Sequence, residues 1–468
     1  MERFLKTNKK KALQYIEDSS FKEKFDNFSP FLINNFETDT KIFSEFWKSC
    51  NEYISNFPLK SKRNEKEKYA TSTTKSFCDI TRKIFLRKYS SYIYSKLTNN
   101  MSKFIDLDDL VYNINALVPH ITPTQKEINI ENTKVLKEKE GIEINQALVV
   151  SAVLQLETEG THLCQSLMLP SQLAKDAENE FIKNRKVDFE GATVEKFGKY
   201  NVATLENPKY LNAEDEKTLK PLEAAVDLAL MDTESELCVL RGGFVYHPKY
   251  KNKRIFGAGI NLTHLYHGKI SYLWYIRRDM GAVNKIFRGI AHEEFSLDDP
   301  FFPLKEKPWI ATLDTFAIGG GCQYLLVTDH IIAEEKSYMT LPARKEGIIP
   351  GVANLRLWRF TDDRVARQAI QNGLRIDSNS KQGSSICDEI IKEGSMDEKL
   401  IETIDAYTSS GVVGLSSNRR AFRVGQEPIE VFRKYMATYS HDQAYCHFSD
   451  ALIKNLENYW NAASRKID

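Results

Sequence analysis

Apolar residues recur at helical spacing through the first 140 residues of the chain. Two groups have this spacing: Ile42, Phe43, Phe46 and Trp47, and later Ile84, Phe85, Tyr89 and Tyr92. Pro58 and the charged residues 60–68 predict one loop, and Pro119 and Pro123 bracket another. The pattern therefore predicts an all-helical region, and we interpret its aromatic stripes as helix core.

Helical spacing continues from 145 to 185, with an interruption near Pro170, and then the period of the pattern changes. Alternating apolar and polar residues predict strands over 192–197, 201–205 and 309–317, and another strand that ends at Gly242 and Gly243. Residues 198–199 predict a tight turn between the first two strands. A helix is expected over 215–231, and amphipathic helix returns after Pro428. Strands interleaved with helices predict the α/β fold class.

Glycine is distributed unevenly along the 468-residue chain. All 22 glycines lie at or after Gly141, although the residues before it make up almost a third of the chain. Helix interiors disfavour glycine by about 1 kcal/mol relative to alanine, which fits the helical region. Tight turns and close backbone approaches are therefore expected after this boundary. Together the patterns predict a helical N-terminal domain over 1–187, an α/β core over 188–430 and a C-terminal helical segment over 431–468.

Composition restricts the class of protein. The hydrophobic and charged fractions, 42% and 28%, are ordinary globular values and exclude wholesale disorder. A net charge of +1 argues against a nucleic-acid or anionic-membrane partner. Seven widely spaced cysteines without a C-x-x-C pair indicate a reduced compartment. The start has no secretory signal, and the longest aliphatic run, 147–156, is about half the length of a membrane span. We expect a soluble cytoplasmic protein.

Common cofactor and nucleophile motifs are absent from the sequence. It contains no P-loop, no G-x-G-x-x-G dinucleotide motif and no G-x-S-x-G nucleophile elbow. His264 and His267 could share one helical face as metal ligands, but no carboxylate close in sequence completes the set. We expect a surface or packing role for both histidines, and no metal.

Two glycine-dense segments carry the candidate chemistry. Residues 255–262 (IFGAGINL) and 308–323 (PWIATLDTFAIGGGCQ) each predict a strand that runs into glycines. Glycines at a strand end and helix start allow backbone N–H groups to point at an anion. Two such places in one fold can form a two-donor oxyanion hole. The alternative is that each segment is a turn where only glycine packs.

These two segments resemble the signature loops of the crotonase (enoyl-CoA hydratase/isomerase) superfamily. The resemblance implies a crotonase (ClpP-like) spiral core in which the N–H groups of Ile260 and Gly320 donate to a thioester oxygen. Hydratases carry two catalytic glutamates where this chain has Gln323 and Ala343. An amide and a methyl group cannot activate and protonate across a double bond, so ordinary hydratase activity is disfavoured.

A narrower resemblance covers residues 140–465 and points to the superfamily's dioxygenases, which use O2 without a metal or organic cofactor. It is carried by HPKYKNKRIFGAGINL, AIGGGCQ, LPARKEGIIPGVANLRL, RQAI and FRKYMATYSHDQAYCHFS. The resemblance implies Glu214 and Gln323 as holders of ring hydroxyls and Arg278 as a group that binds developing negative charge. Arg277 is an adjacent competitor for Arg278. A long helical N-terminal region is a further shared feature.

The resemblance also implies a set of residues that bind substrate and CoA: His247, Pro248, Lys249, Tyr250, Ala258, Gly259, Asn261, Leu262, Thr263, Gly319 and Gly321. The basic cluster Lys249, Lys251, Lys253 and Arg254 either contacts CoA phosphates or is a solvated loop. Glu346, with Arg344 and Lys345, is either catalytic or pins its loop. Ile348 and Ile349 either line an O2 pocket or pack in the core.

The implied reaction converts (3,5-dihydroxyphenyl)acetyl-CoA, or a similar aryl-acetyl-CoA, with O2 to the aryl glyoxylate plus CoA through a thioester enolate. One alternative is a crotonase-fold thioesterase or isomerase that uses the same oxyanion hole. Another is a non-catalytic acyl-CoA-binding protein. The resemblance further implies a homo-oligomer, a trimer or dimer of trimers.

Overall fold

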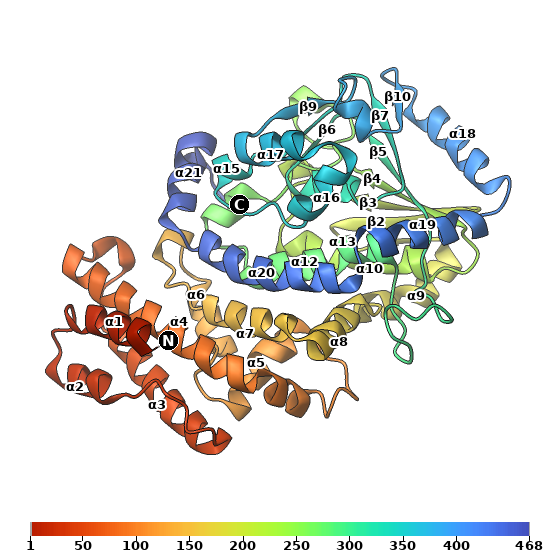
Figure 1. The fold of residues 1–468 in the computed structure, drawn as a ribbon. Coiled ribbons are helices and arrows are strands. Elements are labelled where there is room, and N and C mark those ends of the chain that lie inside the picture. The colour runs from red at the N-terminus through yellow and green to blue at the C-terminus, as the bar shows by residue number, and fades with distance from the viewer. Residues whose placement is uncertain (1, 468) are drawn as a thin grey trace. The chain divides into compact units, whose positions relative to one another are not determined.

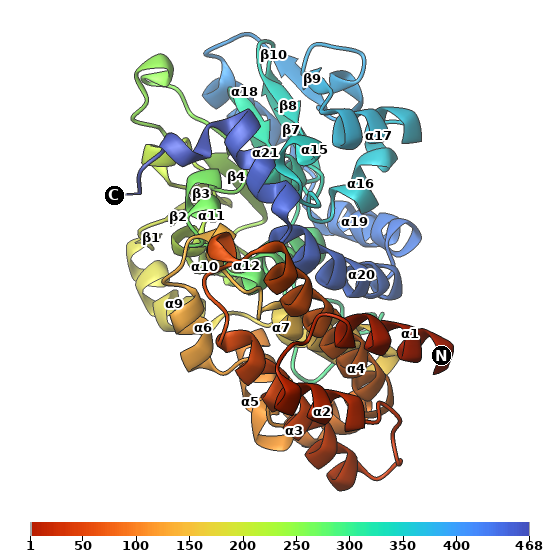
Figure 2. The same ribbon diagram turned by 90° about the vertical axis from the view of Figure 1, so that its left-hand side faces the viewer.

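Helices make up most of the chain up to residue 184, as the spacing of apolar residues predicts. The computed structural model describes residues 2–467 and groups them into two units (Figures 1 and 2). One unit contains the residues up to Leu163 with Met436–Asp450, and the other contains Cys164–Tyr435 with the residues from Ala451 onwards. The three-part division at residues 187 and 430 stays a prediction.

The first unit is all-helical. Its helices are α1 (Glu2–Leu13), α2 (Ser19–Asn27), α3 (Phe36–Ser55), η1 (Lys60–Lys62), α4 (Glu65–Leu97), α5 (Leu107–Leu117), α6 (Gln125–Glu131), η2 (Leu136–Glu138) and α7 (Ile144–Gln155). Two further helices, α8 (Glu157–Met168) and α20 (Ile429–His447), contain residues of both units. The interruptions expected near Pro123 and Pro170, and the helix after Pro428, are confirmed.

The expected loop over 60–68 is only partly correct, because α4 begins at Glu65. Asn64 caps this helix: its Oδ1 accepts from the N–H of Glu67 at 3.0 Å, and the Asn64 N–H donates to Glu67 Oε2 at 2.8 Å. The acidic residues of the first turn also suit the positive end of the helix dipole. A charged stretch that looked like a loop therefore contains a helix start.

Aromatic side chains form the core of the first unit. Trp47 of α3 is fully buried, packs edge-on against Phe43 and Phe85, and donates from Nε1 to Thr81 Oγ1 at 2.9 Å. The interpretation of the aromatic stripes as core is confirmed for these residues. It is wrong for Tyr92, whose side chain is 43% exposed.

The second unit is built on a seven-stranded sheet. Its strands, in spatial order, are β1 (Lys186–Asp188), β2 (Ala192–Phe197), β3 (Tyr200–Leu205), β4 (Leu237–Gly242), β5 (Trp309–Leu313), β7 (His330–Glu334) and β10 (Glu389–Ile391). The first three pair antiparallel and the rest parallel. The register places Val239 beside Val202 and Ile310. Four of these strands were predicted from alternation.

A second, three-stranded sheet contains β6 (Phe316–Ile318), β8 (Tyr338–Thr340) and β9 (Arg375–Asp377). The prediction of one strand over 309–317 is therefore wrong. The chain leaves the large sheet after Leu313 and enters the small one at Phe316, pairing in parallel with β8. Alternation continues across the bend, so periodicity alone cannot reveal the change of sheet.

Helices surround both sheets. They are α9 (Gln172–Asn184), η3 (Pro208–Tyr210), α10 (Glu216–Met231), η4 (Pro248–Tyr250), α11 (Leu262–Tyr266), α12 (Tyr272–Met280), α13 (Ala282–Arg288), α14 (Gly320–Leu325), α15 (Ala343–Glu346), α16 (Ala353–Phe360), α17 (Asp363–Asn372), η5 (Gly383–Ser385), α18 (Met396–Thr408), α19 (Val413–Gln426), α21 (Asp450–Trp460) and η6 (Ala462–Ser464). None of the helices within residues 2–467 has the length and apolar composition that a membrane crossing requires.

Opposite faces of the large sheet are covered by different helices. Met396, Leu400 and Ile404 of α18 pack on a buried cluster from the strands: Leu237, Val239, Ile310 and Ile332. Helix α10 lies along the other face, against β2 and β3 (Figure 1). Burial on both faces explains why β4 and β5 in the middle of the sheet are mostly apolar.

The two glycine-dense segments run side by side in the second unit. Residues 255–262 form no regular strand, which corrects the prediction, but Gly257 pairs in parallel with Ala317, and the N–H of Ile318 donates to the Gly257 carbonyl at 2.9 Å. A Cβ on Gly321 would lie 2.8 Å from that same carbonyl oxygen. The absence of a side chain therefore sets how closely the segments approach.

We expect Gly321→Ala to push the two segments apart and to lower the free energy of unfolding by about 1–3 kcal/mol, the usual cost of overpacking. Gly425→Ala is the matched control, because that glycine lies in α19 with no atom within 4 Å of an added Cβ. The control should raise the unfolding free energy by about 0.5–1 kcal/mol. Urea denaturation measures both, and equal stability of the two variants would contradict the prediction.

Candidate active site

A buried arginine gathers the predicted polar residues. Arg278 lies on α12 with only 2% of its surface exposed. Its Nε donates to Glu214 Oε2 at 2.7 Å, and its Nη2 donates to Glu214 Oε1 at 2.9 Å and to the Gly320 carbonyl at 2.8 Å. Its Nη1 donates to Asp279 Oδ1 and to Gln323 Oε1, both at 2.9 Å. All five guanidinium N–H groups are thereby engaged.

This geometry places Arg278, rather than Arg277, between Glu214 and Gln323. Burial lowers the pKa of Arg278, but Glu214, Tyr324 and Asp279 outweigh this effect and raise the pKa well above its ordinary range. A permanently charged guanidinium with every N–H occupied is suited to holding its neighbours in place. It has no N–H left for an oxyanion of a substrate.

Tyr324 is a member of this cluster that the sequence reasoning missed. Its hydroxyl donates to Glu214 Oε2 at 2.8 Å, and Cζ of Arg278 lies 4.5 Å from the centre of its ring. Burial raises the pKa of the Tyr324 phenol well above its ordinary value. The charge of Arg278 lowers this pKa, and that of Glu214 raises it. Tyr324 directly follows Gln323 in the sequence, and this position was the available signal.

The first glycine segment is held against Glu214. The Glu214 N–H donates to the Gly259 carbonyl and the Asn261 N–H donates to the Glu214 carbonyl, both at 2.7 Å, so that Ile260 pairs with Glu214. Gly259 has a φ of +77°, and a Cβ there would lie 2.8 Å from the Ile318 carbonyl and 3.3 Å from the Gly320 nitrogen. Both features favour glycine at this position.

The N–H groups of Ile260 and Gly320 at this junction have no acceptor among residues 2–467, and neither do those of Gly257, Ala258, Gly259 and Gly321. Motif resemblance singles out the first two. Ile260 is 8% exposed, and a buried N–H normally has a partner. A Cβ on Gly320 would lie 2.4 Å from Glu214 Oε1, so a side chain does not fit there. The arrangement can supply two donors to an oxyanion.

The other predicted binding residues lie in two places. Asn261, Leu262 and Thr263 open α11, where Asn261 Oδ1 accepts from the N–H of His264 at 3.1 Å. His247, Pro248 and Lys249 are exposed around η4, and Tyr250 packs against Phe316. Ala258, Gly319 and Gly321 belong to the paired glycine segments. The stretch 247–249 is thus exposed, whereas Tyr250 packs against the same buried apolar cluster as Ala258.

The residues of the basic cluster that precedes the first glycine segment differ in their contacts. Lys253 pairs with Glu393 at 2.5 Å, and Arg254 lies over the Phe244 ring at 4.2 Å and donates to the Gly242 carbonyl. Lys249 and Lys251 are exposed.

The residues that follow α15 lie against Gln323. A Cβ on Gly351 would be 2.2 Å from Gln323 Oε1 and 2.6 Å from Asp279 Oδ2, and Gly351 has a φ of +48°. Tyr435 donates its hydroxyl to the Gly351 carbonyl. Ile348 is buried and Ile349 half-buried, and their proposed part in an O2 pocket stays a prediction.

Glu346 is buried without a side-chain partner among the described residues. It is 6% exposed, and burial raises its pKa from 4.5 to about 7. Its neighbours on α15 are covered by α21 (Figure 2), where Asn455 donates to the Arg344 carbonyl and Trp460 to the Lys345 carbonyl, both at 3.2 Å. Side chains of α21 therefore hold the backbone of α15 in place.

The two histidines that were considered as metal ligands contact different partners. His267 Nε2 lies 2.8 Å from the carbonyl of Arg465. His264 Nδ1 lies 3.0 Å from Asp215 Oδ2, a carboxylate that spacing along the sequence did not place beside it.

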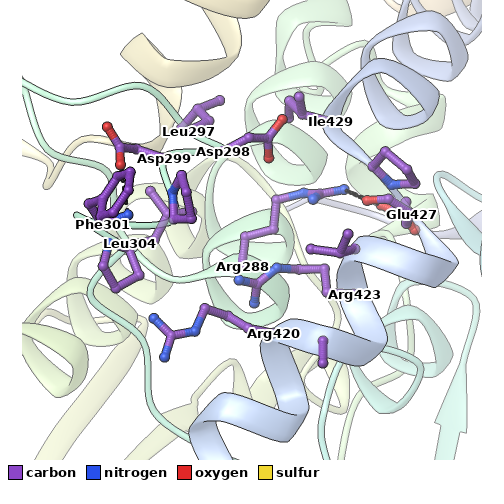
Figure 3. A pocket seen from close by; sticks show the side chains of 15 residues that line it. Arg288, Leu297, Asp298, Asp299, Phe301, Leu304, Arg420, Arg423, Glu427 and Ile429 are labelled. Atoms are coloured by element: carbon purple, nitrogen blue, oxygen red, sulfur yellow. Dashed lines mark hydrogen bonds and ion pairs between the residues drawn. The ribbon is translucent and has the colours of Figure 1, made fainter.

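A cavity of about 750 Å³ lies elsewhere in the second unit (Figure 3). Its lining includes Arg288, Arg420, Arg423, Phe301 and Glu427, and none of the predicted site residues. Arg288 pairs with Glu427 at 3.1 Å, and Arg423 and Arg420 both pair with Glu306. Its cations already have anionic partners, so size alone does not identify the site.

The chain is similar in sequence to known proteins. A family model described as enoyl-CoA hydratase/isomerase matches residues 302–429. The chain is 34% identical over 419 residues to (3,5-dihydroxyphenyl)acetyl-CoA 1,2-dioxygenase of Amycolatopsis orientalis, covering 89% of this chain and 94% of that protein. It is 24% identical over 243 residues to short-chain-enoyl-CoA hydratase of Clostridium acetobutylicum, covering 52% and 84%. A crystal structure of an enoyl-CoA hydratase from Mycobacterium avium subsp. paratuberculosis superposes with a TM-score of 0.48 at 15% identity, covering 57% of this chain and 98% of that one.

We expect Glu346 to make stability depend on pH. Because its folded-state pKa of about 7 exceeds its ordinary 4.5, the folded chain retains a proton that the unfolded chain releases, and stability falls as pH rises toward 7. Between pH 5 and pH 8, Glu346→Gln should gain about 3 kcal/mol of unfolding free energy relative to the parent. Urea denaturation at both values measures this gain. The exposed Glu398→Gln is the control, and an identical pH trend in both variants would contradict the assignment.

Proposed function

The chain belongs to the enoyl-CoA hydratase/isomerase (crotonase) family, and from this premise we propose that it is a dioxygenase of an aryl-acetyl-CoA. Its substrates are (3,5-dihydroxyphenyl)acetyl-CoA, or a similar aryl-acetyl thioester, and O2, and its products are the aryl glyoxylate and CoA. The observation that carries the proposal is the match along nearly the full length of the Amycolatopsis dioxygenase. Family membership also carries the crotonase fold predicted for the α/β unit.

The first step is removal of a proton from Cα of the thioester. The resulting carbanion is delocalised into the thioester and the aromatic ring, which places negative charge on the thioester oxygen. The N–H groups of Ile260 and Gly320, which have no protein acceptor, are proposed to bind this oxygen. One such donor is typically worth about 3 kcal/mol of transition-state stabilisation.

The second step uses the electron-rich enolate as the reductant of O2. One electron passes to O2, and the resulting superoxide and Cα radical combine to form a peroxide at Cα. The terminal peroxide oxygen attacks the thioester carbonyl and expels CoA as its thiolate. Cleavage of the O–O bond with loss of the second Cα proton gives the aryl glyoxylate, which then contains both oxygen atoms of O2. Because the enolate supplies the electrons, we infer that no metal or organic cofactor is needed.

The polar cluster is proposed to hold the aromatic ring. Gln323 uses its carbonyl oxygen for Arg278, and its amide nitrogen donates to no acceptor among the described residues, so it can donate to a ring hydroxyl. Glu214 can accept from a second hydroxyl on lone pairs that Arg278 and Tyr324 leave free. We had expected Arg278 to bind developing negative charge. With all five N–H groups engaged, we instead assign it the task of positioning Glu214 and Gln323.

An amide at position 323 suits this cluster better than the glutamate of hydratases. A carboxylate there would be the third, beside Asp279 and Glu214, around the single guanidinium of Arg278.

The homo-oligomer and the cytoplasmic location stay predictions.

Oxygen-electrode traces with metal-stripped protein and (3,5-dihydroxyphenyl)acetyl-CoA test the reaction. We expect one O2 consumed for each CoA released, and both atoms of ¹⁸O2 in the glyoxylate. Release of CoA without O2 uptake would replace the proposal with a thioesterase. Binding of the thioester without turnover would replace it with an acyl-CoA-binding protein.

We expect Gln323→Glu to fold and to lower kcat/KM for oxygenation at least about 10-fold, because it removes the amide donor and adds a buried charge. The exposed Gln368→Glu on α17 is the matched control and should leave the rate unchanged. Circular dichroism checks the fold of both variants. An unchanged rate in Gln323→Glu would remove this residue from the proposed site.

A further inference from the structure

A buried carboxylate lies directly behind Glu214. Asp215 is 1% exposed, and its Oδ2 accepts from Asn207 Nδ2 at 3.1 Å and from Asn261 Nδ2 at 3.0 Å. The same oxygen lies 3.0 Å from His264 Nδ1. Burial raises the pKa of Asp215, but the hydrogen bonds from His264 and Asn261 outweigh it and lower the pKa below its ordinary value. The carboxylate thus joins three loops.

One of these loops carries an oxyanion donor. Asn261 follows Ile260 and is held at three points: its N–H by the Glu214 carbonyl, its Nδ2 by Asp215, and its Oδ1 by the N–H of His264. The Ile260 N–H belongs to the Gly259–Ile260 peptide, whose carbonyl accepts from the Glu214 N–H. The contacts of Asn261 hold the next peptide and so restrain this plane from its C-terminal side.

The backbone alone gives this segment little support. Ile260 and Glu214 form an isolated bridge rather than a ladder, and α11 is five residues long. Gly259 before it has a φ of +77°, a region that glycine enters and leaves at little cost. Side-chain hydrogen bonds therefore add to the two backbone bonds that join this segment to Glu214.

His264 completes the restraint. Its ring stands edge-on to Tyr210 at 4.9 Å, and its side chain is 12% exposed. A carboxylate that binds one ring nitrogen fixes the orientation of an imidazole. The His264 N–H binds the side chain of Asn261, and the His264 ring contacts Asp215. His264 therefore links Asn261, at the start of α11, to Asp215.

We propose that Asp215 and His264 are positioning residues that hold the 259–261 segment against Glu214 and so aim the Ile260 N–H at the thioester oxygen. The inference rests on the proposed function. Active sites need their groups within about 0.5 Å of the productive geometry, so a loosened segment slows enolisation.

The test measures exchange of the Cα protons of (3,5-dihydroxyphenyl)acetyl-CoA with D2O in the absence of O2, which reports enolisation alone. His264→Ala should slow exchange about 10- to 100-fold with KM little changed, since displacing one oxyanion donor has effects of this order. His264→Asn, whose amide nitrogen can replace Nδ1, should restore most of the rate. His267→Ala, one turn further on, is the matched control. Equal rates for His264→Ala and His267→Ala, or no rescue by asparagine, would overturn the inference.

A second measurement needs no turnover. Amide hydrogen exchange of the peptide that covers residues 258–266 should accelerate in His264→Ala and remain as in the parent in His264→Asn and His267→Ala. If the parent protein takes up no O2 but these differences appear, the proposed oxygenation fails and the positioning role stands. If O2 uptake is present and both measurements leave His264→Ala unchanged, only the positioning role fails.

Discussion

The buried charge of Arg278 is the constraint on which the rest of the site depends. Removing a guanidinium from water is costly unless every N–H finds an acceptor, and here two carboxylates, an amide and a backbone carbonyl provide them. Those acceptors come from three separate stretches of chain, around residues 214, 279 and 320–323. Satisfying one charge therefore assembles the site, even though such a cluster need not add stability compared with an apolar core.

Two glycines provide the space that these polar side chains occupy. Gly320 and Gly351 leave room for the side-chain oxygens of Glu214 and Gln323, which would otherwise meet a methyl group at 2.4 and 2.2 Å. The composition boundary at Gly141 lies inside the helical unit, which extends to Leu163 and contains two glycines, Gly141 and Gly160. The close approaches of backbone to polar side chains lie in the other unit, which holds most of the glycines.

Much of the fold could be predicted from periodicity, because a 3.6-residue or two-residue repeat reflects burial directly. Strands β2 and β3 and the helix after residue 215 were predicted within one residue. The passage from β5 to β6 could not be, since alternation persists where hydrogen-bond partners change. The candidate site residues were predicted from motif resemblance, and the structure brings Glu214, Arg278 and Gln323 into contact. Tyr324 and the contact between Asp215 and His264 could not be predicted, because both depend on which side chains face each other across loops.

The complete occupation of Arg278 has a consequence for how such a site can diverge. Replacing any one acceptor leaves a buried N–H without a partner, so a tolerated change at position 214, 279 or 323 requires a compensating change at another. These positions should covary as a group across related sequences. The exposed His247, Pro248 and Lys249 share no hydrogen-bond network of this kind, so no such covariation is expected among them.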